Sequence, residues 1–379
     1  MKSKNLNHGY KTQSKLWKQF LKYAMSIIPS ELSRQRRDNS TCKFQSQMTF
    51  RLCTSFRKLE FHNNRGIALI TVILIISIIV AIAIELNRST RAAIYDAANL
   101  SDGIKLIYIA KSGFFGAAAL LSDASNDCIT LRDNWAQAEM LSAQSRTLFA
   151  DGYFTAIVED ETGKIPLNKL VNGNEYDPVI KEILIRLLTQ DEFGLDDKKV
   201  YEIVDSLKDW IDADNSVTGY GAETSYYTSL DPPYEAKNAQ LDCIEELLMV
   251  RGITNEIFTG TKEKPGLAQY VTADSDGAIN INTAPKMVLR SLSAGISAEL
   301  ADRMDEYRRE EGNDLSNPQW YKQVSGMADV VISPGLITVR SNYFKIISVG
   351  KMKNMEQSLS GVVKRSGQKS VQIIKLRQD

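Results

Sequence analysis

Histidine is nearly absent from this sequence, and its absence excludes the commonest catalytic arrangements. The chain of 379 residues contains two histidines, His8 and His62, and both lie near the N-terminal end. Histidine is the most frequent general base near neutral pH and the most frequent metal ligand in proteins. The sequence also lacks a glycine-rich phosphate-binding loop and a Gly-x-Ser-x-Gly nucleophile elbow. We therefore expect a protein that is not an enzyme.

Acidic residues are scarce before residue 66, although the two signs of charge balance over the whole chain. The sequence has 46 basic and 46 acidic residues, so the molecule as a whole carries no nucleic-acid signature. Before Gly66 the acidic residues are Glu31, Asp38 and Glu60, whereas lysine and arginine are frequent there. This excess of basic residues predicts that the N-terminal end stays in the cytoplasm and that the remainder is exported.

A long apolar run occupies residues 67–84. It contains no charged residue, no proline and no glycine. About 18 residues at roughly 1.5 Å per residue span about 27 Å, which is close to the hydrocarbon thickness of a bilayer. The run alone is typical of a single-pass membrane anchor. A secretory signal peptide is disfavoured, because the run is long and no small-x-small cleavage site follows it.

Cysteine is also scarce. Cys42 and Cys53 lie before the apolar run, whereas Cys128 and Cys243 lie in the part that we expect to be exported. Disulfides persist in oxidising compartments outside the cytoplasm, so a disulfide between Cys128 and Cys243 is one interpretation. The other is that both are small buried hydrophobic residues. The sequence does not distinguish these two interpretations, because it says nothing about the distance between the two residues.

The junction Arg65-Gly66-Ile67 resembles the processing site of type IV prepilins and pseudopilins. In that family a cytoplasmic leader ends in glycine, and prepilin peptidase cleaves after the glycine and methylates the new N-terminus. The resemblance implies cleavage between Gly66 and Ile67 and N-methylation of Ile67. Most members have a glutamate five residues into the mature chain, where this sequence has Thr71. The general secretion pathway protein K family of minor pseudopilins is the branch that lacks this glutamate.

Residues 1–66 are therefore interpreted as a cleaved cytoplasmic leader. The leader would be unusually long for the family, and a start at Met48 would give an ordinary length. The start codon stays open among Met1, Met25 and Met48, and a genuine cytoplasmic extension is the alternative interpretation.

After the apolar run the pattern predicts that the same helix continues into water. Residues 67–86 form its predicted transmembrane part, and residues 87–168 form the first part of a pilin-like domain. Apolar residues recur at helical spacing and give an amphipathic face: Ile104, Ile107, Ala110, Phe114, Ala117 and Leu121. No proline or turn cluster lies between residues 84 and 112, which favours one rod of about 50 residues over two separate helices.

The expected fold class is α/β, with a type IV pilin-like fold in which the long N-terminal helix packs on an antiparallel sheet. Alternating residues predict one strand early and several at the C-terminal end: 153–158, 336–340, 343–349, 359–364 and 371–376. A large all-helical insertion of SAM-like or helix-hairpin-helix type is predicted for residues 169–330. Residues 331–379 then supply the C-terminal strands of the pilin-like domain.

Within the insertion we expect three amphipathic helices in residues 178–252 and two in residues 278–312. The last two resemble a helix-hairpin-helix repeat, with a cap at Asn282-Thr283-Ala284-Pro285. Many such repeats bind DNA phosphates. The second helix here is too acidic for that role, so we expect no nucleic-acid partner.

An acidic loop follows one of the predicted helices. Residues 209–234 closely resemble a segment of the K family that carries calcium, and the resemblance implies the ligands Asp212, Asp214, Asn215 and Glu223. Carboxylate, amide and carbonyl oxygens suit calcium, and glycines bend the loop. The nearest basic residues, Lys208 and Lys237, are at its margins. The alternative is a solvated acidic loop that holds no ion.

Together these features are identified as those of a type II secretion minor pseudopilin of the K family. The resemblance implies the partners of such a subunit: the minor pseudopilins I and J, the major pseudopilin, prepilin peptidase and the inner membrane. It also implies a place at the tip of a periplasmic pseudopilus that supports protein export. A minor pilin of a type IV pilus is one alternative, and a single-pass enzyme or receptor is another.

Overall fold

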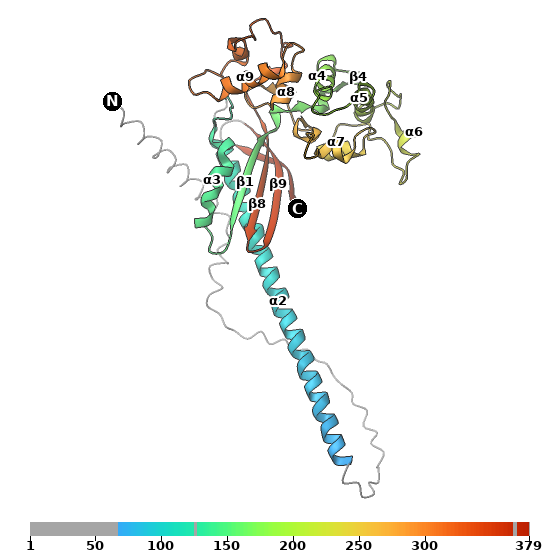
Figure 1. Ribbon diagram of the computed structural model, residues 1–379, viewed down its shortest axis with the longest axis vertical. Coiled ribbons are helices and arrows are strands. Elements are labelled where there is room, and N and C mark those ends of the chain that lie inside the picture. The colour runs from blue at the N-terminus through green and yellow to red at the C-terminus, as the bar shows by residue number, and fades with distance from the viewer. Residues whose placement is uncertain (1–66, 125–126, 367–369, 379) are drawn as a thin grey trace, which may run out of the picture.

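The structure of the protein, a computed structural model, describes residues 67–124, 127–366 and 370–378. The predicted leader, including Gly66, lies outside the described residues. Figure 1 shows a long helical rod that carries a sheet along its C-terminal part, with a helical domain beyond the end of the sheet. The expected α/β class, with a long helix on an antiparallel sheet, is confirmed.

The rod is a continuous helix, α2, from Ile67–Asp123, which confirms the expectation of one helix. Two hydroxyl groups in its apolar part bond to the helix's own backbone: Thr71 donates to the carbonyl of Ala68 and Ser77 to that of Ile73, at 2.9 and 2.8 Å. No polar side chain there has to be hydrated, so this part is long and apolar enough to cross a membrane.

The main sheet has the order β1-β8-β9-β10 and is antiparallel throughout. Its strands are β1 (Tyr153–Asp160), β8 (Tyr343–Met352), β9 (Met355–Arg365) and β10 (Val371–Gln378). The C-terminal part of α2 buries Phe114 and Ala117 against Phe154 and Phe344 of the sheet. The edge strand β1 is flanked by the short helices η2 (Asn134–Gln137), α3 (Ala138–Ser142) and η3 (Ala143–Thr147).

The helical domain has its own hydrophobic core, which includes Ile165 and Val339 and therefore extends beyond the predicted insertion at both ends. Its α-helices are α4 (Pro178–Leu188), α5 (Asp197–Ile211), α6 (Thr224–Tyr227), α7 (Asn255–Thr259), α8 (Lys286–Ser291) and α9 (Ala298–Arg309). The domain also contains short 3-10 helices: η4 (Glu161–Gly163), η5 (Leu167–Lys169), η6 (Ile244–Met249), η7 (Leu267–Gln269) and η8 (Pro318–Gln323).

Short strand pairs complete the helical domain. β2 (Ile165–Pro166) pairs with β5 (Val271–Thr272), β3 (Val171–Asn172) with β4 (Glu175–Tyr176), and β6 (Ile279–Asn280) with β7 (Ile337–Thr338).

Two sequence predictions were wrong. The predicted strand at 336–340 is not in the main sheet, because Leu336 and Val339 are buried in the helical core and β7 pairs with β6 there. The third amphipathic helix predicted for the insertion is not an α-helix. The structure has the short 3-10 helix η6 at that place.

A buried carboxylate joins the two cores. Asp160 ends β1, and its Oδ2 accepts hydrogen bonds from Thr283 at 2.6 Å, from Asn280 at 3.3 Å and from Ser341. Its Oδ1 accepts from the backbone N–H of Thr162 at 2.9 Å. Burial raises the pKa of Asp160 to about 6, despite these donors. The end of the sheet is therefore tied directly to the helical domain.

Candidate metal centre

The acidic loop begins where α5 ends. Asp196 caps the N-terminus of α5 by accepting from the N–H of Lys199 at 2.7 Å. One face of the helix is apolar and packs into the helical core through Val200, Ile203, Val204, Leu207 and Ile211. Packing of that face fixes the orientation of the helix. Asp209 in the last turn and Asp212 at the C-cap are therefore both buried.

Three of the four predicted ligands come together at this point. Asp212, Asp214 and Glu223 each offer a carboxylate oxygen, and these oxygens lie within 4.8 Å of one another. Asp212 and Glu223 are 1% exposed. Asp212 Oδ1 and both oxygens of Glu223 are buried without a hydrogen-bonding partner in the described part of the chain. Buried carboxylates without donors are costly, so a hard divalent cation such as calcium fits this cluster.

Asn215, the fourth predicted ligand, follows Asp214 directly in the loop. It is exposed, and its amide oxygen accepts a hydrogen bond from Nδ2 of Asn238 at 3.2 Å. Asn238 Nδ2 also donates to the backbone carbonyl of Asp214 at 2.8 Å, while its own Oδ1 is buried without a partner among the described residues. Asn238 is therefore a further oxygen beside the loop that the sequence reasoning did not assign.

Two glycines let the loop wrap closely around the carboxylates of α5. A Cβ on Gly219, whose φ is +50°, would lie 2.3 Å from Oδ2 of Asp205, and one on Gly221 would lie 2.1 Å from Oδ2 of Asp209. The backbone N–H of Tyr220 donates to Asp205 at 2.9 Å. Only a residue without a side chain fits at these two positions.

The positions of the two basic residues near the site differ from those expected from the sequence. Lys208 is buried inside it, instead of lying at its margin, and donates to Asp212 Oδ2 at 2.6 Å. Lys237 pairs elsewhere, with Asp242 and Glu246. Burial raises the pKa of Glu223 to about 7, and the nearby Asp209 and Asp212 carboxylates add to this effect. The spacing of four residues between Lys208 and Asp212 could have indicated this ion pair in the sequence, because residues four apart lie on the same face of a helix.

The two cysteines beyond the apolar run are both free thiols, so the disulfide that the sequence left open is not formed. Cys128 contacts the backbone carbonyl of Leu315 at 3.3 Å. Cys243 instead lies at the start of η6, beside Glu246. The two residues occupy different surroundings, and burial raises the pKa of each thiol, which disfavours the reactive thiolate.

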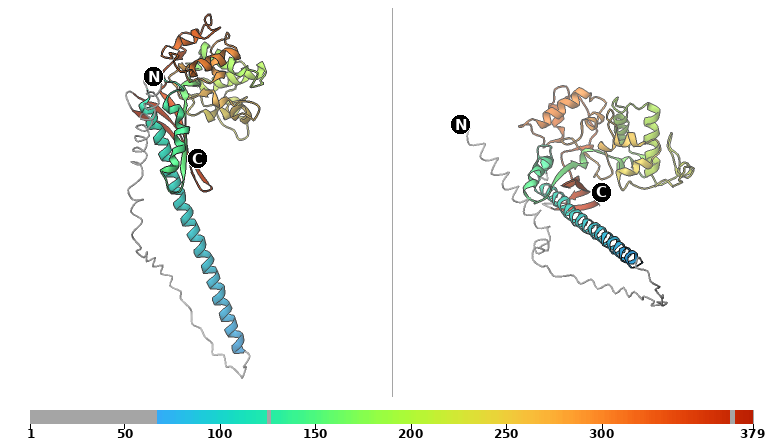
Figure 2. Two further views of the ribbon diagram at one scale, coloured as in Figure 1. Left: turned by 60° about the vertical axis from the view of Figure 1, so that its left-hand side comes forward. Right: turned by 60° about the horizontal axis from the view of Figure 1, so that its bottom comes forward.

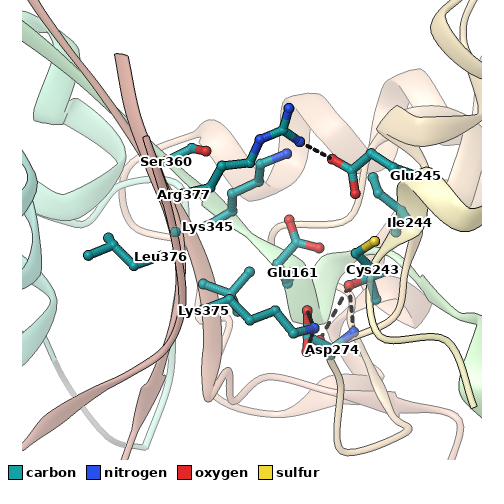
Figure 3. A pocket seen from close by; sticks show the side chains of 13 residues that line it. Glu161, Cys243, Ile244, Glu245, Asp274, Lys345, Ser360, Lys375, Leu376 and Arg377 are labelled. Atoms are coloured by element: carbon teal, nitrogen blue, oxygen red, sulfur yellow. Dashed lines mark hydrogen bonds and ion pairs between the residues drawn. The ribbon is translucent and has the colours of Figure 1, made fainter. Parts of the chain in front are cut away.

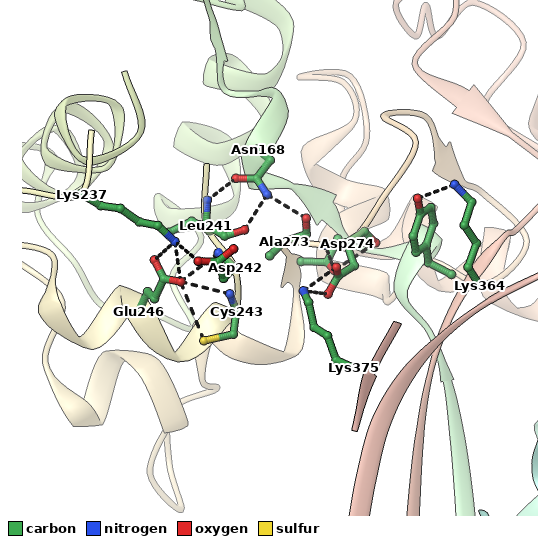
Figure 4. A network of polar contacts seen from close by, with 12 residues as sticks. Asn168, Lys237, Leu241, Asp242, Cys243, Glu246, Ala273, Asp274, Lys364 and Lys375 are labelled. Atoms are coloured by element: carbon green, nitrogen blue, oxygen red, sulfur yellow. Dashed lines mark hydrogen bonds and ion pairs between the residues drawn. The ribbon is translucent and has the colours of Figure 1, made fainter. Parts of the chain in front are cut away.

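A cavity of about 190 Å³ separates the helical domain from β9 and β10 (Figure 3). Lys375 and Arg377 of β10 face Asp274 and Glu245 across it, and the Lys375–Asp274 ion pair measures 2.6 Å. Figure 4 shows the adjoining polar network, in which Asn168 holds the backbone carbonyls of two separate segments. The cavity lies at the interface between the two domains. Its lining residues do not include a nucleophile paired with a general base.

The helix-hairpin-helix segment is formed by α8 and α9. Arg308 is buried and pairs with Asp305 at 2.6 Å, and Arg309 pairs with the same carboxylate group at 2.9 Å. These guanidinium groups are engaged within the domain. The absence of a nucleic-acid partner stays a prediction.

Comparisons with known proteins agree on one family. A family described as "Type II secretion system (T2SS), protein K" matches residues 163–272, which include the acidic loop. Type II secretion system protein K of Aeromonas hydrophila is 27% identical, over 79% of this chain and 92% of its own length. The protein K of Pseudomonas aeruginosa is 25% identical, over 82% of this chain and 92% of its own length.

A solved structure shares the fold. It is described as "the GspK-GspI-GspJ complex from enterotoxigenic Escherichia coli Type 2 Secretion System". The match has a TM-score of 0.55 at 20% identity and covers 75% of this chain and 99% of the other. The chain is therefore similar over most of its length to type II secretion system protein K, and this similarity supports the role of a minor pseudopilin.

Proposed function

We propose that this chain caps the tip of a periplasmic pseudopilus and thereby supports protein export across the outer membrane. The observation that carries the proposal is the position of the helical domain beyond one end of the rod and sheet, which Figure 2 presents from two further directions. A fibre grows by stacking rods side by side, and a wide domain at that end obstructs a further subunit above it. The partners of this subunit are the minor pseudopilins I and J, with the major pseudopilin below them.

Co-expression tests this assembly. The mature chain, produced with the I and J subunits in detergent, should co-purify with both as one complex. A matched sample with the major pseudopilin alone should give a weaker association. Recovery of the chain without either minor subunit would contradict the proposal.

We further propose that the apolar part of α2 spans the inner membrane, with the N-terminus cytoplasmic and the sheet and helical domain periplasmic. The exposed apolar side chains of residues 68–84 support this placement, because the described part of the chain covers none of that surface. Prepilin peptidase would cleave after Gly66 and methylate Ile67. Mass spectrometry of the assembled protein should then detect N-methylated Ile67 as its first residue, and Gly66→Ala should leave a longer precursor. An intact leader on the assembled protein would contradict cleavage.

Calcium is the proposed ion of the acidic loop. Asp212, Asp214 and Glu223 would hold it, with Asn215 and Asn238 beside them. A bound cation would offset the repulsion among the three carboxylates and fix the loop between α5 and α6. Its role is structural stabilisation of the domain that forms the tip.

A further inference from the structure

Lys208 occupies an unusual position for a cation. It is 6% exposed, and its ammonium donates to Asp212 Oδ2 at 2.6 Å and to Thr218 Oγ1 at 2.9 Å. The ring of Tyr176 lies 5.6 Å from the same nitrogen. A lysine is seldom buried unless it is paired, and this one is paired with a carboxylate of the proposed calcium site.

The contact with Lys208 uses one oxygen of Asp212 and leaves the other for a metal ion. Oδ2 is held by Lys208, whereas Oδ1 is buried and has no partner in the described part of the chain. Asp212 is therefore prepared to give one oxygen to an ion. The three ligand carboxylates carry three negative charges, and the ammonium of Lys208 offsets one of them. The nearby carboxylate of Asp209 adds to the negative charge of the site.

We propose that Lys208 determines the charge specificity of this site, so that it favours divalent calcium over trivalent ions of similar size. The inference rests on the proposed calcium function. Lys208 repels any bound ion, and the repulsive free energy grows in proportion to the charge of that ion. Other nearby charges do not alter this comparison, because they are the same before and after Lys208 is replaced.

A purely structural role for Lys208 makes a different prediction. If the lysine only orients Asp212, its replacement weakens binding of both kinds of ion together. If its charge sets specificity, a change that strengthens calcium binding about tenfold strengthens binding of a trivalent ion about thirtyfold, because the charges are in the ratio of three to two. The ratio of the two affinities therefore separates the two roles, since any loss of orientation is common to both ions.

The experiment compares calcium and terbium, which are similar in size, on the full mature chain in detergent micelles. Affinities are measured by titration calorimetry for calcium and by sensitised luminescence for terbium. Lys208→Gln keeps a hydrogen-bond donor and removes the charge, whereas Lys208→Arg keeps the charge. Lys199→Gln is the matched control on the same helix, because Lys199 pairs with Glu202 and not with a ligand. The terbium-to-calcium ratio should rise about threefold in Lys208→Gln and stay unchanged in the other two.

Each outcome decides a different claim. If the unsubstituted protein binds no calcium, the proposed site and this inference both fall. If it binds calcium and the ratio is unchanged in Lys208→Gln, only the inference falls. Should Lys208→Gln fail to fold, the calcium-bound structure of the unsubstituted protein decides instead. Lys208 must still contact Asp212 there, and its displacement by the ion would overturn the inference.

Discussion

Two buried carboxylates, Asp160 at the end of β1 and Glu223 in the helical domain, have different hydrogen-bond partners. Asp160 is surrounded by donors from Thr283, Asn280 and Ser341, which compensate part of its desolvation. Glu223 is also buried, but both of its oxygens lack a donor among the described residues. The first arrangement is a complete hydrogen-bond network that connects two cores. The second is incomplete until a cation joins it.

Removing the ligands of the proposed ion should remove its stabilising effect. At a calcium concentration about a hundredfold above Kd, binding to the folded state adds about 2.7 kcal/mol to the free energy of unfolding. The protein in detergent should therefore melt at a higher temperature with calcium than with chelator. Asp214→Ala or Glu223→Ala should abolish most of that difference, whereas Glu235→Ala, at an exposed position in the same region, should preserve it. Equal melting temperatures with calcium and chelator would refute the site.

Asp160 should make stability depend on pH in a defined direction. Its pKa rises from 3.8 to about 6 on folding, so the folded protein binds this proton more tightly. The group contributes stability below about pH 4 that is lost as the pH rises to about 6, and the total is about 3 kcal/mol.

Asp160→Asn removes this titration and leaves every other group in place. Its free energy of unfolding in urea, followed by tryptophan fluorescence, should be compared with that of the unsubstituted protein from pH 4 to pH 7. The advantage of the unsubstituted protein should shrink as the pH rises. Parallel curves over that range would show that Asp160 is not the titrating group.

At the scale of elements, α2 changes its surroundings along its length. Its first part has apolar side chains that nothing in the described chain covers, whereas its C-terminal part is buried against the sheet. Contact with the sheet is close at Gly113, because a Cβ there would lie 2.3 Å from Ser348 Oγ and 2.7 Å from the ring of Phe154. Ser348 is itself held by a hydrogen bond to the carbonyl of Ala110 at 2.8 Å.

Two glycines of α2 should respond oppositely to the same substitution. Gly113→Ala adds a methyl group to a filled interface and should destabilise the sheet core by about 1–3 kcal/mol. Gly103 has no atom within 4 Å of an added Cβ, so Gly103→Ala should stabilise the helix by up to about 1 kcal/mol. Urea midpoints of the two variants provide the measurement. A neutral Gly113→Ala would mean that the helix does not approach the sheet this closely.

For the whole molecule, the relevant fact is that a rod, a sheet and a bulky domain are joined at fixed positions. Asp160 connects the cores at the end of β1, and the Lys375–Asp274 ion pair connects β10 to the helical domain. A subunit built in this way carries its helical domain at one end of the molecule and its apolar helix at the other (Figure 1).

Thr71→Glu tests the place of the molecule in the fibre. Resemblance to the pseudopilin family implies that glutamate at this position pairs with the N-terminal amine of a neighbouring subunit, and a subunit at the tip has no such partner ahead of it. An unpaired charge in hydrocarbon costs about 2.5 to 3.5 kcal/mol. The variant should therefore reduce secretion in cells that lack the native chain, whereas Thr71→Ser should not. Secretion at the unsubstituted level would count against a tip position.

Sequence by itself determined the features that depend on local spacing. The apolar run and the amphipathic stripe predict one continuous helix, because helical periodicity is set by neighbours three and four residues apart. Alternation predicted β8, β9 and β10 for the same reason. The resemblance of one short segment to the K family implied Asp212, Asp214 and Glu223, and the carboxylate oxygens of these three residues lie close together in the structure.

Tertiary structure alone decided the features that depend on which distant segments pack together. Residues 336–340 alternate like a strand, but burial of Leu336 and Val339 assigns them to the helical core. Lys208 lies beside a loop in sequence, and only the packing of α5 turns its ammonium inward to Asp212. Asp160 reads as an ordinary acidic residue, and its role exists because residues more than a hundred positions away supply its donors. A side chain's partners follow from the burial of whole elements, which no local pattern encodes.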